Sequence, residues 1–251
     1  MKPGSDHEDQ RHTERPTAGS RRPWVVGVSG ASGTPYAAAV LRGLLDAGES
    51  VDLIVSRASR LTLLDETGIS FRDARWREDL RVWLARGADG KPDTFAPDVS
   101  DVRHWAAGDL AAGPSSGSYR TKGMLIVPAS TASVAGVALG LSKDLLQRAA
   151  SVTLKERRAL VVAVRETPLG GATLRQLVAL DEAGAVVLPA SPGFYAGATH
   201  IQDLVDFVAG RVLDAAGVPH RLYRRWEGEL GGSRTGPDPD PGADRTGPAP
   251  A

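Results

Sequence analysis

The residues best suited to chemistry begin with a glycine-rich stretch near the N-terminus, Gly27–Gly33, which reads GVSGASG. It lies between the apolar run Trp24–Val26 and a segment of helical composition that starts near Tyr36. A strand that turns through glycines into a helix presents free backbone N–H groups and the positive end of the helix dipole, and both attract phosphate. The stretch therefore predicts a site for a phosphorylated ligand.

Three further turns with hydroxyl, cationic or acidic groups follow apolar runs later in the chain: Ser56-Arg57, Pro128–Ser133 and Arg165-Glu166. In open parallel sheets, ligands bind beyond the carboxyl ends of the strands, so these turns should lie at one edge with the glycine stretch. Each serine taken alone is equally well explained as a helix cap, because Ser and Thr favour that position. Four such turns together favour a ligand site.

The glycine spacing narrows the choice of ligand. The stretch reads G-x-x-G-x-x-G, whereas a dinucleotide site has G-x-G-x-x-G, and Ser56-Arg57 stands where an NAD site has a carboxylate. NAD is therefore disfavoured. NADP stays open as a minor alternative, because Arg57 and Arg60 could meet its 2′-phosphate. The P-loop pattern G-x-x-x-x-G-K-[ST] is missing from the sequence, which argues against a P-loop nucleotidase.

Two long cations share one flank of a helix predicted over Lys143–Arg158. The seven-residue step from Arg148 to Lys155 places both side chains nearly in register beside the apolar face of that helix. Arg148 is flanked by alanines and is expected to bind an anion, since a cation beside an apolar stripe needs a partner. Arg157 and Arg158 are expected in a solvated last turn, which the helix dipole favours.

Glu166 is the carboxylate best placed for acid–base chemistry. It follows a strand that looks buried and precedes Thr167-Pro168, where partial loss of solvent could move its protonation toward neutrality. The alternative is a simple ion pair with Arg165 or a helix-cap contact, and the residues alone favour this alternative.

Short apolar runs alternate with helical patterns and must position these groups. Strands are predicted at Trp24–Val28, Val51–Val55, Met124–Val127, Leu160–Val164 and Val186–Leu188. Helices are predicted at Tyr36–Ala47, Ser59–Thr67, Thr131–Leu139, Lys143–Arg158, Thr173–Ala183 and Gln202–Ala216. This alternation predicts a single α/β domain with a Rossmann-like or flavodoxin-like parallel sheet and helices on both faces. The pattern is weakest between Ser70 and Tyr119, where a helix is predicted around Trp76–Ala85 and a Gly/Ser loop at Gly113–Ser118.

Composition limits the remaining possibilities. The 251 residues suffice for one such domain over residues 23–230, and the charged, Pro- and Gly-rich tails at 1–22 and 231–251 are expected to be disordered. Thirty basic residues balance thirty acidic ones, so no global field favours nucleic acid or a membrane surface. Cysteine is absent and the five histidines lack ligand spacing, so no metal site is expected. No apolar run approaches the roughly 20 residues of a membrane span, and we expect a cytoplasmic protein.

Five stretches together resemble the flavin prenyltransferase family, the UbiX-like proteins formerly described as aromatic acid decarboxylase subunits. They are Gly27–Gly33, Pro128–Thr131, Leu154–Arg158, Arg165–Leu169 and Pro192–Tyr195, in the same order and spacing. The resemblance runs from about Trp24 to Trp226. It implies transfer of a dimethylallyl group from dimethylallyl phosphate to N5 and C6 of reduced FMN without a metal.

The resemblance also implies which residues form the site. The FMN-binding positions would be Gly30, Ala31, Ser32, Ser56, Ser130, Thr131, Ala132, Ser133 and Arg148. The positions around the prenyl phosphate would be Lys155, Arg165, Glu166, Tyr195 and Arg211. Of these, all but Arg211 would form the catalytic set, with Glu166 as the acid–base candidate. Trp226 would line an aromatic pocket. The family implies a homo-oligomer, a dodecamer built of trimers, and a UbiD-type decarboxylase as recipient of the prenylated FMN.

One position departs from the family pattern, and two other activities stay open. Leu110 stands where some members carry a tryptophan, so the aromatic lining and the donor preference are less well defined. The first is an FMN-dependent decarboxylase of the phosphopantothenoylcysteine or lantibiotic type, whose fold resembles the one predicted here. Those enzymes use a catalytic histidine and a P-A-S-A-N-T stretch, whereas this chain reads PASTAS with no histidine nearby. The second is a flavin carrier without catalytic activity.

Overall fold

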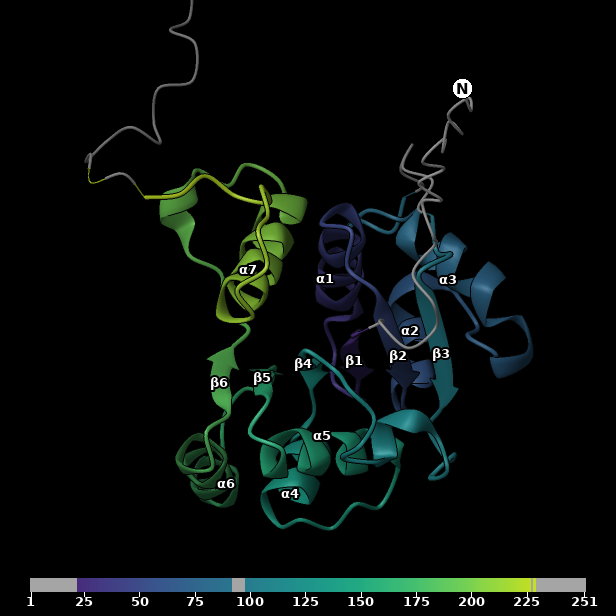
Figure 1. The fold of residues 1–251 in the computed structure, drawn as a ribbon. Helices are drawn as coiled ribbons and strands as arrows, with labels where there is room; N and C mark the ends of the chain where they lie inside the picture. Colours follow the sequence, from purple (N-terminus) through teal and green to yellow (C-terminus); the bar gives the residue numbers. More distant parts are fainter. Residues whose placement is uncertain (1–21, 92–97, 227, 229–251) are drawn as a thin grey trace, which may run out of the picture.

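The computed structural model describes residues 22–91, 98–226 and 228, which form one α/β domain around a six-stranded parallel sheet (Figure 1). The strands are β1 (Trp24–Val28), β2 (Val51–Val55), β3 (Val102–Ala106), β4 (Gly123–Ala129), β5 (Ala159–Val164) and β6 (Val186–Pro189). Their order is β3-β2-β1-β4-β5-β6. This is the Rossmann order, in which the direction of winding reverses between β1 and β4, where ligands bind at the carboxyl ends.

Seven α-helices among the described residues cover the two faces of the sheet. They are α1 (Thr34–Asp46), α2 (Ser59–Thr67), α3 (Trp76–Leu84), α4 (Thr131–Ala138), α5 (Leu145–Lys155), α6 (Gly171–Glu182) and α7 (Ile201–Ala215). Buried side chains of α1, α2, α3 and α7 form one core with one face of the sheet, and those of α4, α5 and α6 form a second core with the other. The fold class predicted from the sequence is therefore confirmed.

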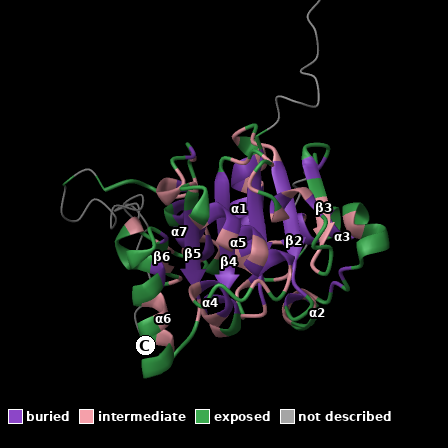
Figure 2. Cartoon of the chain, turned by 60° about the horizontal axis from the view of Figure 1, so that its bottom comes forward, coloured by how far each residue is buried: buried purple, intermediate pink, exposed green. Residues whose placement is uncertain are grey.

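Alternation along the strands divides their side chains between the two cores. In β1, Val26 and Val28 lie in the first core and Val25 in the second. Because successive side chains of a strand point to opposite faces, a strand covered on both sides is largely apolar. Figure 2 shows the central strands buried and the outer face of α6 exposed. The central strands thus give a rigid support for the turns at their carboxyl ends.

The predicted strands are found within two residues of their expected ends, and β3 is the strand that the sequence pattern missed. Its sequence, VRHWA, mixes charged and apolar residues because it lies at the edge of the sheet. Val102 is buried while Arg103 is exposed. The strand pairs in register with β2, opposite Val51. In this edge strand only Val102 is buried, so no apolar run marks it.

The expectations for the two tails fall on residues outside the described ranges, apart from Arg22. A search of the described helices finds none that is both long and apolar enough to cross a membrane.

Candidate functional site

Ser29 joins the turn after β1 to the turn after β4. Its side chain is fully buried, its Oγ donates to the Pro128 carbonyl at 2.9 Å, and the Ser130 N–H donates to the same Oγ at 2.7 Å. The Ser29 N–H also donates to Pro128 O at 3.2 Å. The two turns at the switch point of the sheet are therefore one hydrogen-bonded unit. Sequence reasoning placed Ser29 in the glycine stretch and did not predict its bonds to the turn after β4.

The glycine stretch forms a narrow cradle against the β2–α2 turn. A Cβ atom at Gly30 would lie 2.5 Å from the Cβ of Ala58, so only glycine fits there. Gly33 has φ 114°, a conformation that glycine adopts without strain. The Ala31 N–H donates to Ser29 O at 2.8 Å, while the N–H groups of Gly30 and Ser32 have no acceptor among the described residues. These free donors fit a phosphate or a polar flavin edge.

The turn after β4 adds a second set of donors. Ser130 is the N-cap of α4, where its Oγ accepts from the Ser133 N–H at 3.3 Å. The N–H groups of Thr131 and Ala132 are in the first turn of α4 and have no partner inside the helix. The cap expected as the alternative role for a serine is thus present at Ser130, and it leaves two neighbouring N–H groups directed out of the helix end.

Ser56 follows β2 and is almost fully buried. Its Oγ accepts from the Ser59 N–H at 3.1 Å and lies 3.2 Å from the Ser59 Oγ. The Ser56 hydroxyl therefore binds the first N–H group of α2 from within the β2–α2 turn. Ser56 lies beside the glycine stretch because β1 and β2 are paired neighbours, with Val28 opposite Val55.

Glu66, from the last turn of α2, already binds the N-terminus of α1. Its carboxylate accepts from the Gly33 N–H at 2.8 Å, the Thr34 N–H at 2.8 Å and the Thr34 hydroxyl at 2.6 Å. Burial opposes its charge, but these bonds and one from the Ser32 hydroxyl together lower the pKa of Glu66 below its usual value. The expected phosphate cradle thus offers fewer free N–H donors than the sequence suggested, because the first N–H groups of α1 are occupied by this carboxylate. The sequence held no signal for Glu66, since only the packing of α2 brings it there.

A cavity of about 540 Å³ opens beside this cluster. Its polar lining is Ser32, Glu66 and Arg165. The apolar lining comes from α1, the segment after β6 and the first turns of α7, with Pro35, Tyr36, Pro192, Ile201, Leu204 and Val205. Burial raises the pKa of Tyr36, and the nearby Arg165 opposes that rise. A cavity of this size with few polar groups is typical of small-molecule sites.

Arg165 and Glu166 follow β5 at the same edge of the sheet, but only Arg165 faces the glycine stretch. Its Nε donates to Ser32 O at 3.1 Å. Glu166 is exposed, and its carboxylate accepts from the neighbouring Thr167 N–H at 3.0 Å. The expected loss of solvent around Glu166 is therefore not found in the single chain, because no described element covers the turn after β5.

Arg148 and Arg158 both hold the Gly/Ser loop against α5. The Nε of Arg148 donates to Ser115 O at 3.0 Å. Arg158 donates to Gly117 O at 2.7 Å and to Tyr119 O at 2.8 Å, and it is half-buried. The prediction of a solvated Arg158 is wrong, because the chain between β3 and β4 runs along α5 and brings its carbonyl groups to this side chain.

The Gly/Ser loop has the letters G-x-S-x-G from Gly113 to Gly117, the pattern of a hydrolase nucleophile elbow. That elbow needs a sharp turn from a strand into a helix. Here Gly113–Ser115 is a short 3-10 turn between β3 and β4, packed against α5. The pattern therefore has no catalytic geometry in this fold.

Lys155 lies near the amino ends of the strands, whereas Glu166 lies at their carboxyl ends. It ends α5, which leads into the amino end of β5, whereas Glu166 follows the carboxyl end of that strand. The six residues of β5 span roughly 16 Å at the usual rise per residue. The Nζ of Lys155 pairs with Glu156 at 2.5 Å. One chain therefore does not bring Lys155 together with Arg165 and Glu166.

Tyr195 and Trp226 form an aromatic group beside α7. The Tyr195 ring meets Phe207 edge-on with centroids 5.5 Å apart and meets Trp226 edge-on at 6.1 Å. Both side chains stay about half exposed, at 47% and 52%. Arg211 projects from the same helix and lines a cavity of about 290 Å³ between β6 and α7. The residues expected around the prenyl phosphate are thus divided among three places.

The histidines of the described segments lie away from these turns. His104 is in β3 against Phe71 and Trp76, His200 precedes α7, and His220 follows it. No group of three His, Asp or Glu residues within 22–91, 98–226 and 228 is arranged to hold a metal ion.

Comparison with known proteins agrees with this geometry. The Flavoprotein family profile matches residues 12–213. A flavin prenyltransferase UbiX of Streptomyces coelicolor is 87% identical over 212 residues, which are 84% of this chain and 98% of that protein. Among solved structures, AnUbiX (PadA1) in complex with FMN and dimethylallyl pyrophosphate has a TM-score of 0.70 at 33% identity, over 84% of this chain and 100% of that one.

A second solved structure is described as a dodecameric FMN-dependent UbiX-like decarboxylase from Escherichia coli O157:H7. It has a TM-score of 0.69 at 33% identity and covers 82% of this chain and 100% of its own. The residues that the family profile matches include the glycine stretch and the turns after β4 and β5. The chain therefore belongs to the flavin prenyltransferase UbiX family of flavoproteins.

Proposed function

We propose that this chain joins a dimethylallyl group from dimethylallyl phosphate to N5 and C6 of reduced FMN, giving prenylated FMN. The observation that carries the proposal is the pair of turns joined by Ser29, with free N–H donors on both, in a chain 87% identical to a flavin prenyltransferase. The related AnUbiX structure holds FMN and a dimethylallyl pyrophosphate. Reduced FMN supplies a nucleophilic N5 and an open C6 position.

The residues proposed to hold FMN are those of the two joined turns and their neighbours. They are Gly30, Ala31, Ser32, Ser56, Ser130, Thr131, Ala132, Ser133 and Arg148. Their backbone N–H groups and hydroxyls match the acceptors of a phosphate and of a flavin edge. Arg148 has one nitrogen on Ser115 O, and its guanidinium retains further N–H groups for an anion. The donor set therefore fits FMN.

The reaction breaks the bond between C1 of the donor and its phosphate oxygen, and the phosphate leaves with the electron pair. C1 bonds to N5 and C3 bonds to C6, while the C2=C3 double bond of the donor is consumed. The N5 and C6 hydrogens leave as protons, of which one ends on C2 and the other on the phosphate, so the flavin gains C5H8. We propose that Lys155, Arg165 and Arg211 stabilise the charge on the departing phosphate. In this proposal Tyr195 donates to the phosphate, Glu166 moves a proton, and Trp226 shields the allylic carbon chain from water.

A complete site of this kind needs more than one chain. Lys155 and Glu166 lie at opposite ends of β5, and Glu166 is exposed in the single chain. We therefore propose that a second copy supplies Lys155 to the turn after β5, within a homo-oligomer that is a dodecamer. The related protein of E. coli is dodecameric. The product passes to a UbiD-type decarboxylase in the cytoplasm.

The test is anaerobic incubation of the purified protein with reduced FMN and dimethylallyl phosphate, followed by mass analysis of the flavin. A gain of C5H8 is expected, and a parallel reaction with dimethylallyl pyrophosphate compares the two donors. Flavin that returns unchanged from both reactions, while FMN binding is intact, would favour the carrier alternative over transfer.

Two substitutions separate transfer from FMN binding. Glu166→Gln and Tyr195→Phe should each lower the transfer rate by about a hundredfold, typical of losing a proton-transfer group, while FMN affinity changes less than about twofold because neither residue lies in the joined turns. Transfer rates come from quenched samples analysed by mass, and affinity from flavin fluorescence. Equal losses of affinity and rate in both variants would contradict the assignment.

A further inference from the structure

Asp214, near the end of α7, gathers four hydrogen-bond donors on one carboxylate. Its Oδ1 accepts from His220 Nε2 at 3.0 Å and from an Arg225 nitrogen at 2.7 Å. Its Oδ2 accepts from Arg211 at 3.0 Å and from the Tyr223 hydroxyl at 2.6 Å. Both oxygens are thus used, and all partners except Arg211 belong to the segment after α7.

A carboxylate in the last turn of a helix is normally unfavourable, because the helix dipole is negative there. Asp214 is the second-last residue of α7. Burial further opposes its charge, yet the bonds from Arg225, Tyr223 and His220 lower its pKa to about 2. The residue therefore stays ionised through its partners, and they in turn depend on its charge.

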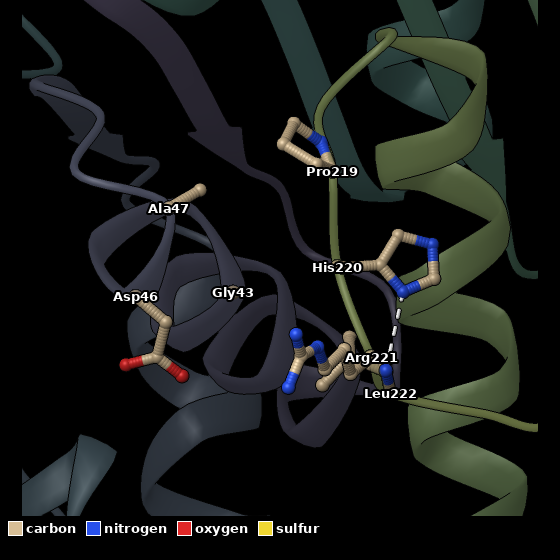
Figure 3. A pocket seen from close by; sticks show the side chains of 7 residues that line it. All are labelled: Gly43, Asp46, Ala47, Pro219, His220, Arg221 and Leu222. Atoms are coloured by element: carbon tan, nitrogen blue, oxygen red, sulfur yellow. Dashed lines mark hydrogen bonds between the residues drawn. The ribbon is translucent and has the colours of Figure 1, made fainter.

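The histidine in this cluster has a defined tautomer. The Leu222 N–H donates to His220 Nδ1 at 3.2 Å, as the dashed line in Figure 3 shows. Because Nδ1 accepts, the proton of the neutral ring lies on Nε2 and points to Asp214. His220 is thereby a bridge between Asp214 and the backbone of the segment.

The other side of this segment borders a cavity of about 500 Å³, lined by residues 219–222 and by Gly43, Asp46 and Ala47 of the end of α1 (Figure 3). Packing from α1 is therefore incomplete, and Pro219 and Arg221 are exposed. On the α7 side the approach is close: a Cβ atom at Gly210 would lie 2.5 Å from the Tyr223 ring. Val218 and Leu222 of the segment pack on the core, and the hydrogen bonds to Asp214 hold the residues between and after them.

Three residues of the proposed prenyl-phosphate group depend on this arrangement. Arg211 is bound directly by Asp214. The Tyr223 ring packs on Phe207 with centroids 4.9 Å apart, and Phe207 packs edge-on against Tyr195. Trp226 directly follows Arg225, which Asp214 also binds, and Trp226 meets Tyr195.

We propose that Asp214 is a positioning residue, which holds Arg211 and the segment Val218–Trp226 in the arrangement that receives the prenyl phosphate. This rests on the proposed function. Asp214 contacts no reacting group itself. It acts through Arg211 directly, and through Tyr223 and Arg225 on the aromatic pair Tyr195 and Trp226. Its loss should therefore weaken use of the prenyl donor and leave FMN binding intact, because the FMN turns lie at the switch point of the sheet.

The experiment compares Asp214→Asn with Asp181→Asn in the full-length protein. Asp181 is the second-last residue of α6 and exposed, so the control makes the same change at the same helix position. Asp214→Asn should raise KM for dimethylallyl phosphate about tenfold, as expected for one lost charge-assisted bond. FMN affinity should stay within about twofold, and Tyr223→Phe should raise KM about threefold, as for one neutral hydrogen bond.

A double-mutant cycle tests whether the effect passes through Arg211. In the Arg211→Ala background, Asp214→Asn should raise KM by less than about threefold, because coupled residues are not additive. A second readout needs no turnover: trypsin should cut Asp214→Asn faster after Arg221, Arg224 and Arg225 than it cuts the Asp181→Asn control, with the sites mapped by mass.

The outcomes are separable. Unchanged KM in Asp214→Asn or a parallel loss of FMN affinity overturns the positioning role, and a full tenfold rise in the Arg211→Ala background overturns the route through Arg211. If Asp214→Asn does not fold, Tyr223→Phe decides by the same KM and affinity criteria. If the unsubstituted protein forms no prenylated flavin, the proposed function fails, and the cleavage assay alone decides whether Asp214 fixes the segment.

Discussion

Replacing Ser29 by alanine should weaken the connection between the two turns that form the floor of the proposed FMN site. The change removes the bond from Ser29 Oγ to Pro128 O and takes away the acceptor of the Ser130 N–H. Pro128 O keeps the Ser29 N–H, but the Ser130 N–H is left without a partner. Two lost hydrogen bonds and one unpaired donor should lower the free energy of unfolding by about 2–3 kcal/mol.

Ser151→Ala is the matched control. The Ser151 Oγ is also buried, and it has no hydrogen-bond partner among the described residues. Its removal breaks no hydrogen bond and eliminates a desolvated polar group. The free energy of unfolding should therefore change by less than about 0.5 kcal/mol or rise. The comparison therefore isolates the hydrogen bonds from the effect of deleting a buried hydroxyl.

The assay is thermal unfolding of both variants, combined with FMN titration by fluorescence. For a domain of this size, about 1 kcal/mol shifts the melting temperature by roughly 2–4 °C, so Ser29→Ala should melt roughly 4–12 °C lower. It should also bind FMN more weakly, whereas Ser151→Ala should bind it normally. Equal melting temperatures for the two variants would refute the role given to Ser29, and lower stability with unchanged FMN affinity would refute its link to the site.

Two further predictions concern Glu66 and His104. Glu66→Gln should cost about 2 kcal/mol of stability, because an amide cannot accept from the Gly33 N–H and the Thr34 N–H with both of its terminal atoms. Thermal unfolding measures this, and Asp65→Asn on the same helix, exposed, should be neutral; a neutral Glu66→Gln would contradict the capping role. Burial lowers the pKa of His104 to about 4, with Asp73 opposing the shift and Arg60 adding to it. As the pH falls below about 6.5, the His104 imidazole therefore becomes protonated in the unfolded chain before it does in the folded protein. His104 should thus contribute a stability loss of about 2 kcal/mol between pH 7.5 and 5. Denaturant unfolding of His104→Gln should show a profile flatter than the unsubstituted protein by that amount, and parallel profiles would exclude the effect.

The sequence was sufficient where the physics is local. Buried parallel strands are largely apolar, so runs such as Leu160–Val164, and Val51–Val55 with its single buried Asp52, could be predicted closely. Helix ends shifted by up to three residues, as at Lys155, because caps and turns decide them. The turns carrying Ser32, Ser130 and Arg165 could be placed together, because parallel strands all point one way.

Other parts of the site depend on tertiary packing and left no local signal. Glu66 reads as an ordinary exposed carboxylate on a short helix, and only the contact of α2 with α1 brings it to the helix end. The separation of Lys155 from Glu166 follows from the direction of α5 relative to β5, which a list of motifs in chain order does not display. The partners of Asp214 lie on both sides of a turn, so their convergence needed the fold.

The placement of Lys155 and Glu166 at opposite ends of β5 has a consequence for inheritance. If each pocket draws these two residues from different chains, a cell that carries one gene copy damaged at Lys155 and another damaged at Glu166 still builds some intact pockets in mixed assemblies. Two alleles that are each inactive would then complement one another, whereas two alleles damaged at the same end of the sheet would not.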